Sequence, residues 1–194
     1  MQVNDFSQWE IIGQGTERVC YKHPDNPSRC IKISKKSQSK QTKREIKYLN
    51  YLKAKGVSFS HIPEFYNVIE TQDSIGMEVE LVSNFDGSKA LNIRHYVEEN
   101  HTSEDIAQLK LALKELKGNL LKNNIIPCDL LMSNLLVTRL HNGIKIILID
   151  GFGTADAIPL ANYVKFVGNR KIERKWSKFI NKFLTPCIER VTSK

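Results

Sequence analysis

The sequence predicts an α+β fold in two lobes, with strands in the first half of the chain and helices in the second. Three observations support this prediction. Short apolar runs alternate with turn signals through about the first 85 residues. A polar break, Asn84–Ser88, follows, and beyond it apolar residues recur every three or four positions, the spacing of a helix. The expected lobes are residues 1–85 and 86–194, with a hinge near 83–88.

The first lobe is expected to contain antiparallel strands and one inserted helix. The helix is indicated by Ile46, Leu49 and Leu52, which form an apolar stripe at helical spacing. Turns rich in Gly, Pro, Asn and Asp separate the apolar runs on either side of it. The strands are expected at Trp9–Gly13, Arg18–Lys22, Cys30–Ile33, Phe65–Thr71 and Ile75–Val82.

The second lobe is expected to be mostly helical. Thr102 and Asp105 have the spacing of a capping box, and the apolar residues after them predict a helix to about Lys122. A last helix is predicted over residues 170–184. Between these helices the sequence predicts two short strands, residues 135–137 and an apolar run that ends at Asp150.

Charge and composition limit the classes of function. The 194 residues carry a net charge of +8, with basic residues crowded between Lys32 and Lys55 and again between Lys165 and Lys182. Such patches attract nucleotide phosphates, nucleic acid or an acidic partner, and a solvated helix face explains them equally well. No aromatic residues alternate with the lysines, so nucleic acid is the minor hypothesis. Without a secretory pattern or a long apolar run, we expect a cytoplasmic protein that does not enter a membrane.

The densest chemical pattern runs from Pro127 to Gly153. Asp129 and Asn134 lie five residues apart, and Asp150 ends an apolar run just before a glycine. Phosphoryl transfer needs a carboxylate near the attacking hydroxyl and oxygen ligands that hold Mg²⁺ on the phosphates. We therefore expect Asp129 to be catalytic and Asn134 and Asp150 to bind the metal. The alternative interpretation is that these residues only form turns.

Two patterns in the first lobe suggest a phosphate-binding site. Gly13 and Gly15 lie in the turn of the first hairpin, where backbone N–H groups can approach phosphates, although most glycine turns are only turns. Lys32 interrupts an apolar strand, so it either has an anion partner, for which Glu45 is the natural candidate, or faces outward from an edge strand. Arg18 stands at the third glycine position of a G-x-G-x-x-G loop, where it stiffens the loop or contacts phosphate itself.

In this order, the segments resemble the motifs of the protein-kinase-like superfamily over about residues 11–153. G-Q-G-T-E-R-V resembles the Gly-rich loop, C-I-K-I the V-A-I-K strand, C-D-L-L-M-S-N the R-D-L-K-x-x-N catalytic loop, and I-D-G-F-G the D-F-G element. Glu45 resembles the glutamate of the kinase helix C. The resemblance implies a kinase-like fold, ATP and Mg²⁺ as cofactors, and Asp129 and Lys32 as catalytic residues.

The chain departs from the kinase pattern in the second lobe. Leu131 stands where kinases have a catalytic-loop lysine, and Gly151 is an extra residue before Phe152. Only about 41 residues follow Gly153, so the helical lobe is expected to be small and truncated. This length leaves little room to dock a protein, which favours a small-molecule acceptor or autophosphorylation.

A closer resemblance, over nearly the whole chain, is to the PhoP regulatory network protein YrbL family. It rests on R-V-C-Y-K-H-P, R-C-I-K-I, R-E-I-K-Y-L, F-D-G, E-D-I-A-Q-L-K, I-P-L-A and the region from Arg174 to Ile180. The family name implies a bacterial, stress-linked cytoplasmic protein and leaves the substrate open.

Two classes of function follow. The first is an ATP- and Mg²⁺-dependent phosphotransferase whose acceptor is an unknown small molecule or protein. The second is a pseudokinase-like module that binds nucleotide or a partner with little or no catalysis. Leu131 and the short second lobe favour the second class, whereas the joint presence of the five candidate side chains favours the first: Lys32, Glu45, Asp129, Asn134 and Asp150.

Overall fold

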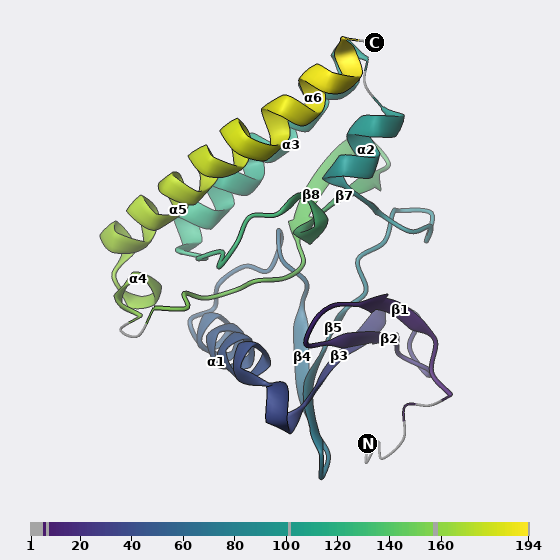
Figure 1. Cartoon of the computed structure of the whole chain (residues 1–194), viewed down its shortest axis with the longest axis vertical. Helices are drawn as coiled ribbons and strands as arrows, with labels where there is room; N and C mark the ends of the chain where they lie inside the picture. Colours follow the sequence, from purple (N-terminus) through teal and green to yellow (C-terminus); the bar gives the residue numbers. More distant parts are fainter. Residues whose placement is uncertain (1–5, 7, 101, 157–158, 194) are drawn as a thin grey trace. The chain divides into compact units, whose positions relative to one another are not determined.

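The computed structural model describes residues 6, 8–100, 102–156 and 159–193 (Figure 1). The chain divides into two compact units. The first comprises Met1–Val57 and Pro63–Leu81, and the second comprises Ser58–Ile62 and Val82–Lys194. The mixed α+β class predicted from the sequence is confirmed, because an antiparallel sheet dominates the first part and most helices come later.

The first unit is built on a five-stranded antiparallel sheet with the order β1-β2-β3-β5-β4. All five predicted strands are present, with small shifts at their ends. The long central strands β3 and β5 bury Ile31, Met77 and Val79, which gives this sheet its apolar core. The strands are β1 Ile11–Gln14, β2 Val19–Lys22, β3 Arg29–Lys35, β4 Phe65–Glu70 and β5 Ser74–Glu80.

One helix, α1 (Lys40–Ala54), follows a short 3₁₀ turn, Lys36–Gln38, and packs on β4 and β5. Its predicted stripe is confirmed, since Ile46, Leu49 and Leu52 are all buried. The hydroxyls of Ser34 in β3 and Thr42 in α1 also lie 2.6 Å apart in a buried hydrogen bond. This bond fixes the start of the helix against the strand that carries Lys32.

The second unit is organised around α3 (Ser103–Asn123). The predicted capping box is confirmed: the Thr102 hydroxyl accepts from the Asp105 N–H, and the Asp105 carboxylate accepts from the Thr102 N–H, each at 3.1 Å. The helix ends at Asn124, whose φ of 53° is left-handed, a conformation that Asn tolerates better than most residues.

A small antiparallel sheet with the order β6-β7-β8 lies beside α3. Its strands are β6 Leu91–Asn92, β7 Leu135–Leu140 and β8 Gly143–Leu148, and the helix α2 (Ile93–Glu99) and the 3₁₀ turn Met132–Asn134 adjoin them. The stretch Ser58–Ile62 contacts this sheet, because the Leu148 N–H donates to the His61 carbonyl oxygen at 2.9 Å. The His61 ring also hydrogen-bonds the Ile146 carbonyl oxygen at 2.9 Å.

The C-terminal helices form a long rod that runs alongside α3 (Figure 1). After α4 (Leu160–Tyr163), the rod consists of α5 (Lys165–Phe179), a π turn (Ile180–Leu184) and α6 (Thr185–Thr192). The predicted last helix is therefore confirmed and extends further at both ends. Pro186 has no N–H for a helical bond, which accounts for the irregular turn just before it. Within the described residues, no helix is long and apolar enough to cross a membrane.

Two glycines allow a matched test of the packing. A Cβ on Gly76 in β5 would overlap the Lys32 carbonyl oxygen and lie 2.6 Å from Cγ1 of Ile33. Gly76→Ala should therefore lower the free energy of unfolding by about 1–3 kcal/mol. A Cβ on Gly118 in α3 would meet nothing within 4 Å, so Gly118→Ala should raise it by up to about 1 kcal/mol. Urea unfolding measures the stability of both variants. Equal unfolding midpoints for Gly76→Ala and Gly118→Ala would contradict the close approach of β3 and β5.

Candidate functional site

The predicted site residues of the second unit lie on two chain segments that pair through their backbones. Residues 126–128 and residues 151–153 share two hydrogen bonds of 2.5 and 2.9 Å and one antiparallel bridge between them. The first segment leads directly into Asp129, and the second follows Asp150. The pairing therefore holds the two aspartates on neighbouring stretches of chain.

Gly151 is the point at which the three predicted residues of this unit come together. Its φ of +78° is strained for any residue with a side chain. A Cβ there would lie 3.5 Å from the Asp129 carbonyl oxygen and 3.8 Å from Nδ2 of Asn134. Gly151, the extra residue before Phe152, therefore makes the turn after Asp150 possible. It also lets this turn pack against Asp129 and Asn134.

The side chains of this cluster differ in exposure and partners. Asp129 is 67% exposed. Asp150 is half-buried, and its Oδ1 accepts from the Gly151 N–H at 2.6 Å. Asn134 is also half-buried, and its Oδ1 accepts from the Ser133 hydroxyl at 3.2 Å. Asp129 is thus placed to meet a dissolved molecule, while the other two are held by their neighbours.

The donor atoms of Asn134 and Asp150 fit Mg²⁺, which prefers carboxylate and carbonyl oxygens and keeps several waters or phosphate oxygens. In the described part of the chain, no three His, Cys, Asp or Glu side chains gather as in a metal site made by protein alone. A metal held by these two residues alone would keep water or phosphate oxygens as its other ligands. The metal-binding role of the two residues stays a prediction.

A lysine from α5 reaches the same cluster. Lys175 donates a hydrogen bond from Nζ to the Cys128 carbonyl oxygen, and its Nζ lies 3.9 Å from Oδ1 of Asp129. Its side chain is only 21% exposed. Lys175 and the carboxylate of Asp129 therefore form an ion pair between two segments that are far apart in the sequence.

Lys171 lies one helical turn before Lys175 and contacts the segment after Gly153. Its ammonium donates to the Thr154 hydroxyl and to the Asp156 carboxylate. The hydrogen bonds from Lys171 and Thr154 hold the pKa of Asp156 below its ordinary value. The sequence indicated no role in the site for either lysine, although their spacing of four on a predicted helix indicates a shared face.

The Gly13–Gly15 turn in the first unit does not depend on glycine for its own conformation. The turn is closed by the Gly15 N–H, which donates to the Arg18 carbonyl oxygen at 2.8 Å. Neither glycine has a positive φ, and a Cβ on either would lie 3.8 Å from its nearest neighbour, an ordinary contact. One remaining reason for glycine at these two positions is that another molecule approaches the backbone of the turn closely.

A buried ion pair joins this turn to α1. Arg18 donates to Oε2 of Glu45, and the two side chains are only 8% and 1% exposed. Lys32 lies in β3 opposite Cys20 of β2 and Met77 of β5. From the sequence, Glu45 was the expected partner of Lys32, and Arg18 was expected to stiffen the loop or to contact phosphate. The Arg18–Glu45 pair was not predicted. The Lys32–Glu45 pair stays a prediction.

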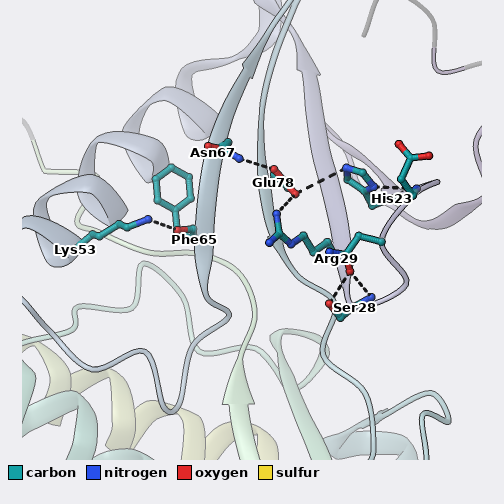
Figure 2. A network of polar contacts seen from close by, with 9 residues as sticks. His23, Ser28, Arg29, Lys53, Phe65, Asn67 and Glu78 are labelled. Atoms are coloured by element: carbon teal, nitrogen blue, oxygen red, sulfur yellow. Dashed lines mark hydrogen bonds and ion pairs between the residues drawn. The ribbon is translucent and has the colours of Figure 1, made fainter. Parts of the chain in front are cut away.

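A second polar cluster of the first unit surrounds Glu78 in β5 (Figure 2). Its carboxylate accepts hydrogen bonds of 2.7 Å from Arg29 and from Asn67, and the His23 ring lies 3.8 Å away. The Arg29 guanidinium also stacks 3.9 Å above the Tyr66 ring centre. These contacts link neighbouring strands and occupy both carboxylate oxygens, so this cluster stabilises the sheet.

Comparison with known proteins identifies the family. The sequence model of the PhoP regulatory network protein YrbL family matches residues 5–184. The proteins named "Uncharacterized protein YrbL" of Escherichia coli K12 and Shigella flexneri are each 34% identical over 179 residues, which cover 90% of this chain and 85% of theirs. The chain therefore belongs to the YrbL family, as its sequence indicated. The names of these two relatives state no activity.

The Glu78 cluster predicts a pH-dependent contribution to stability. Burial raises the pKa of Glu78, but hydrogen bonds from Arg29 and Asn67 and nearby positive charge outweigh it and lower the pKa below 4.5. Because folding lowers this pKa, the carboxylate stabilises the fold above pH 4.5, and this contribution is lost as the pH falls through the folded-state value.

Glu78→Gln should therefore cost about 1–3 kcal/mol at neutral pH, and its difference from the wild type should shrink in acid. Urea unfolding of both proteins from pH 7 to below pH 4.5 measures this difference. A difference that stays constant across the series contradicts the assignment.

Proposed function

We propose that this member of the YrbL family is a compact, kinase-like phosphotransferase that uses ATP and Mg²⁺. The observation that supports it best is the Gly151 turn, which gathers Asp129, Asn134 and Asp150. Catalytic and metal-binding side chains must be held close together for phosphoryl transfer, because positioning and electrostatics supply most of the rate enhancement. The acceptor is a small molecule or a protein that carries a hydroxyl group.

In this proposal, the second unit carries out the transfer. The acceptor oxygen attacks the γ-phosphorus of ATP while its proton passes to the Asp129 carboxylate. The bond between the γ-phosphorus and the bridging oxygen breaks, and ADP leaves with that electron pair. The high exposure of Asp129 suits a group that must meet an incoming hydroxyl. Asn134 and Asp150 would hold Mg²⁺, which supplies positive charge to the phosphate oxygens.

The first unit holds the nucleotide phosphates. The Gly13–Gly15 turn lets the phosphates approach its backbone closely, and the Lys32 ammonium binds their oxygens. The buried Arg18–Glu45 pair fixes the end of the turn against α1, so Arg18 acts by positioning the loop. We also propose a kinase-like two-lobed fold, which is supported by the single helix inserted between the third and fourth strands and by the order of the motifs.

A second candidate is a pseudokinase-like module that binds nucleotide without transferring phosphate. Leu131 favours it, because this exposed apolar side chain stands at the position where kinases have a lysine. The two candidates share nucleotide binding and differ in turnover. Binding without transfer by the purified wild type would select the second.

The first test is nucleotide binding and transfer. Millimolar Mg·ATP should raise the apparent Tm of the wild type, because a ligand that binds the folded state stabilises it, and Lys32→Ala should lose most of this shift. Asp129→Asn should keep the shift and lower the rate of phosphoryl transfer or ATP hydrolysis at least about 100-fold. No Mg·ATP-dependent shift in the wild type would rule out both candidates, and equal turnover in Asp129→Asn would rule out its catalytic role.

The second test concerns the glycine turn. Because a Cβ fits at both positions, Gly13→Ala and Gly15→Ala should unfold at the wild-type Tm without nucleotide. If phosphates approach this backbone closely, each variant should bind Mg·ATP at least about 10-fold more weakly in a titration. Gly118→Ala is the matched control, with unchanged affinity. Wild-type affinity in both turn variants would remove the phosphate-binding role.

A further inference from the structure

We propose that Lys175, on the C-terminal helix α5, provides the positive charge that the loop of Asp129 lacks and positions Asp129 for phosphoryl transfer. The inference rests on the proposed function and assigns a role to a residue far from the motifs. Residues 127–134, the Asp129 loop, contain no Lys or Arg. Leu131 in this loop is 42% exposed and brings no charge.

Two contacts place Lys175 at this loop. Its Nζ donates to the Cys128 carbonyl oxygen, next to Asp129 in the chain, and lies 3.9 Å from the Asp129 carboxylate. The low exposure of the lysine weakens screening by water compared with an open surface pair. One ammonium therefore binds the backbone of the loop and also lies close to the Asp129 carboxylate.

The helix that carries Lys175 is firmly anchored, so the ammonium is held in place. Ile172, Trp176 and Phe179 of α5 are buried. At its start, Gly168 packs so closely on Asn124 that a Cβ there would overlap the amide oxygen. Lys171 binds Thr154 from the same face of the helix, so α5 contacts the chain beyond Asp150 as well.

The charge of Lys175 reduces the electrostatic repulsion between the Asp129 carboxylate and the phosphoryl group in the proposed reaction. Before the acceptor hydroxyl gives its proton to Asp129, the Asp129 carboxylate and the phosphoryl group are both negative. A fixed ammonium beside the carboxylate reduces that repulsion and keeps the carboxylate oriented toward the acceptor. Removing it should slow the transfer step and leave the nucleotide-holding residues of the first unit unchanged.

The test first compares three single variants of the full chain with the wild type. Lys175→Met should lower kcat about 10- to 100-fold and change the KM for Mg·ATP less than about twofold. Lys175→Arg should keep part of the rate, because it keeps the charge. Lys178→Met, an exposed lysine on the same helix, is the matched control and should behave as the wild type. An unchanged kcat in Lys175→Met overturns the proposal.

A second substitution separates charge from packing. Leu131→Lys added to Lys175→Met should recover at least part of the lost rate, since it returns an ammonium to the Asp129 loop. A loss caused only by poorer packing of α5 would not be recovered in this way. Loss of activity in Lys175→Met without any recovery therefore overturns the electrostatic role.

Hydrogen exchange distinguishes failure of this inference from failure of the proposed function. Lys175→Met should speed backbone amide exchange across residues 128–131 at an unchanged Tm, because the loop loses its anchor. If the wild type transfers no phosphate, the proposed function fails and the catalytic part of the inference fails with it. The anchoring of the loop is then decided by exchange alone, and unchanged exchange overturns it.

Discussion

The backbone pairing of residues 126–128 with residues 151–153 is the constraint on which the candidate site depends. It fixes the segment before Asp129 against the segment after Asp150, and it forces the turn between Asp150 and Phe152 into a conformation that only glycine adopts easily. The candidate residues of the second unit are therefore placed by main-chain hydrogen bonds, which tolerate side-chain change nearby. The backbone of the Asp129 loop is therefore held beside Asp150 although the loop has no lysine of its own.

The first unit places its candidate residues in a different way. Lys32 belongs to a central strand that pairs with neighbours on both sides, so its position follows from the sheet. Arg18 and Glu45 are placed by a buried ion pair, whose geometry must be good because both charges have left water. The Glu78 network adds cross-strand bonds elsewhere in the same sheet. Sheet pairing and buried charge together give this unit a rigid frame.

The parts of the fold that the sequence predicts well are those with local causes. Five strands and the capped helix α3 follow from alternation, turn residues and the Thr102–Asp105 pair, all within a few positions of one another. The two-residue strand β6 and the short helix α2 are too brief to leave a periodic pattern. Arg18–Glu45 and Lys175–Asp129 join residues 27 and 46 positions apart, so only the folded chain reveals them. The grouping of Asp129, Asn134 and Asp150 was foreseeable, but the reason for Gly151 was not.

The stretch Ser58–Ile62 has consequences for folding during synthesis and for recombination between related genes. It is synthesised with the first unit, yet its His61 hydrogen-bonds β8, in which Ile146 lies 85 residues after His61. On the ribosome this strip of backbone must wait for its partner before the second unit is complete. The two units also cannot be exchanged as separate cassettes by a single crossover, because each interrupts the other along the gene. Shuffling of lobes between relatives would therefore have to carry this short insertion along.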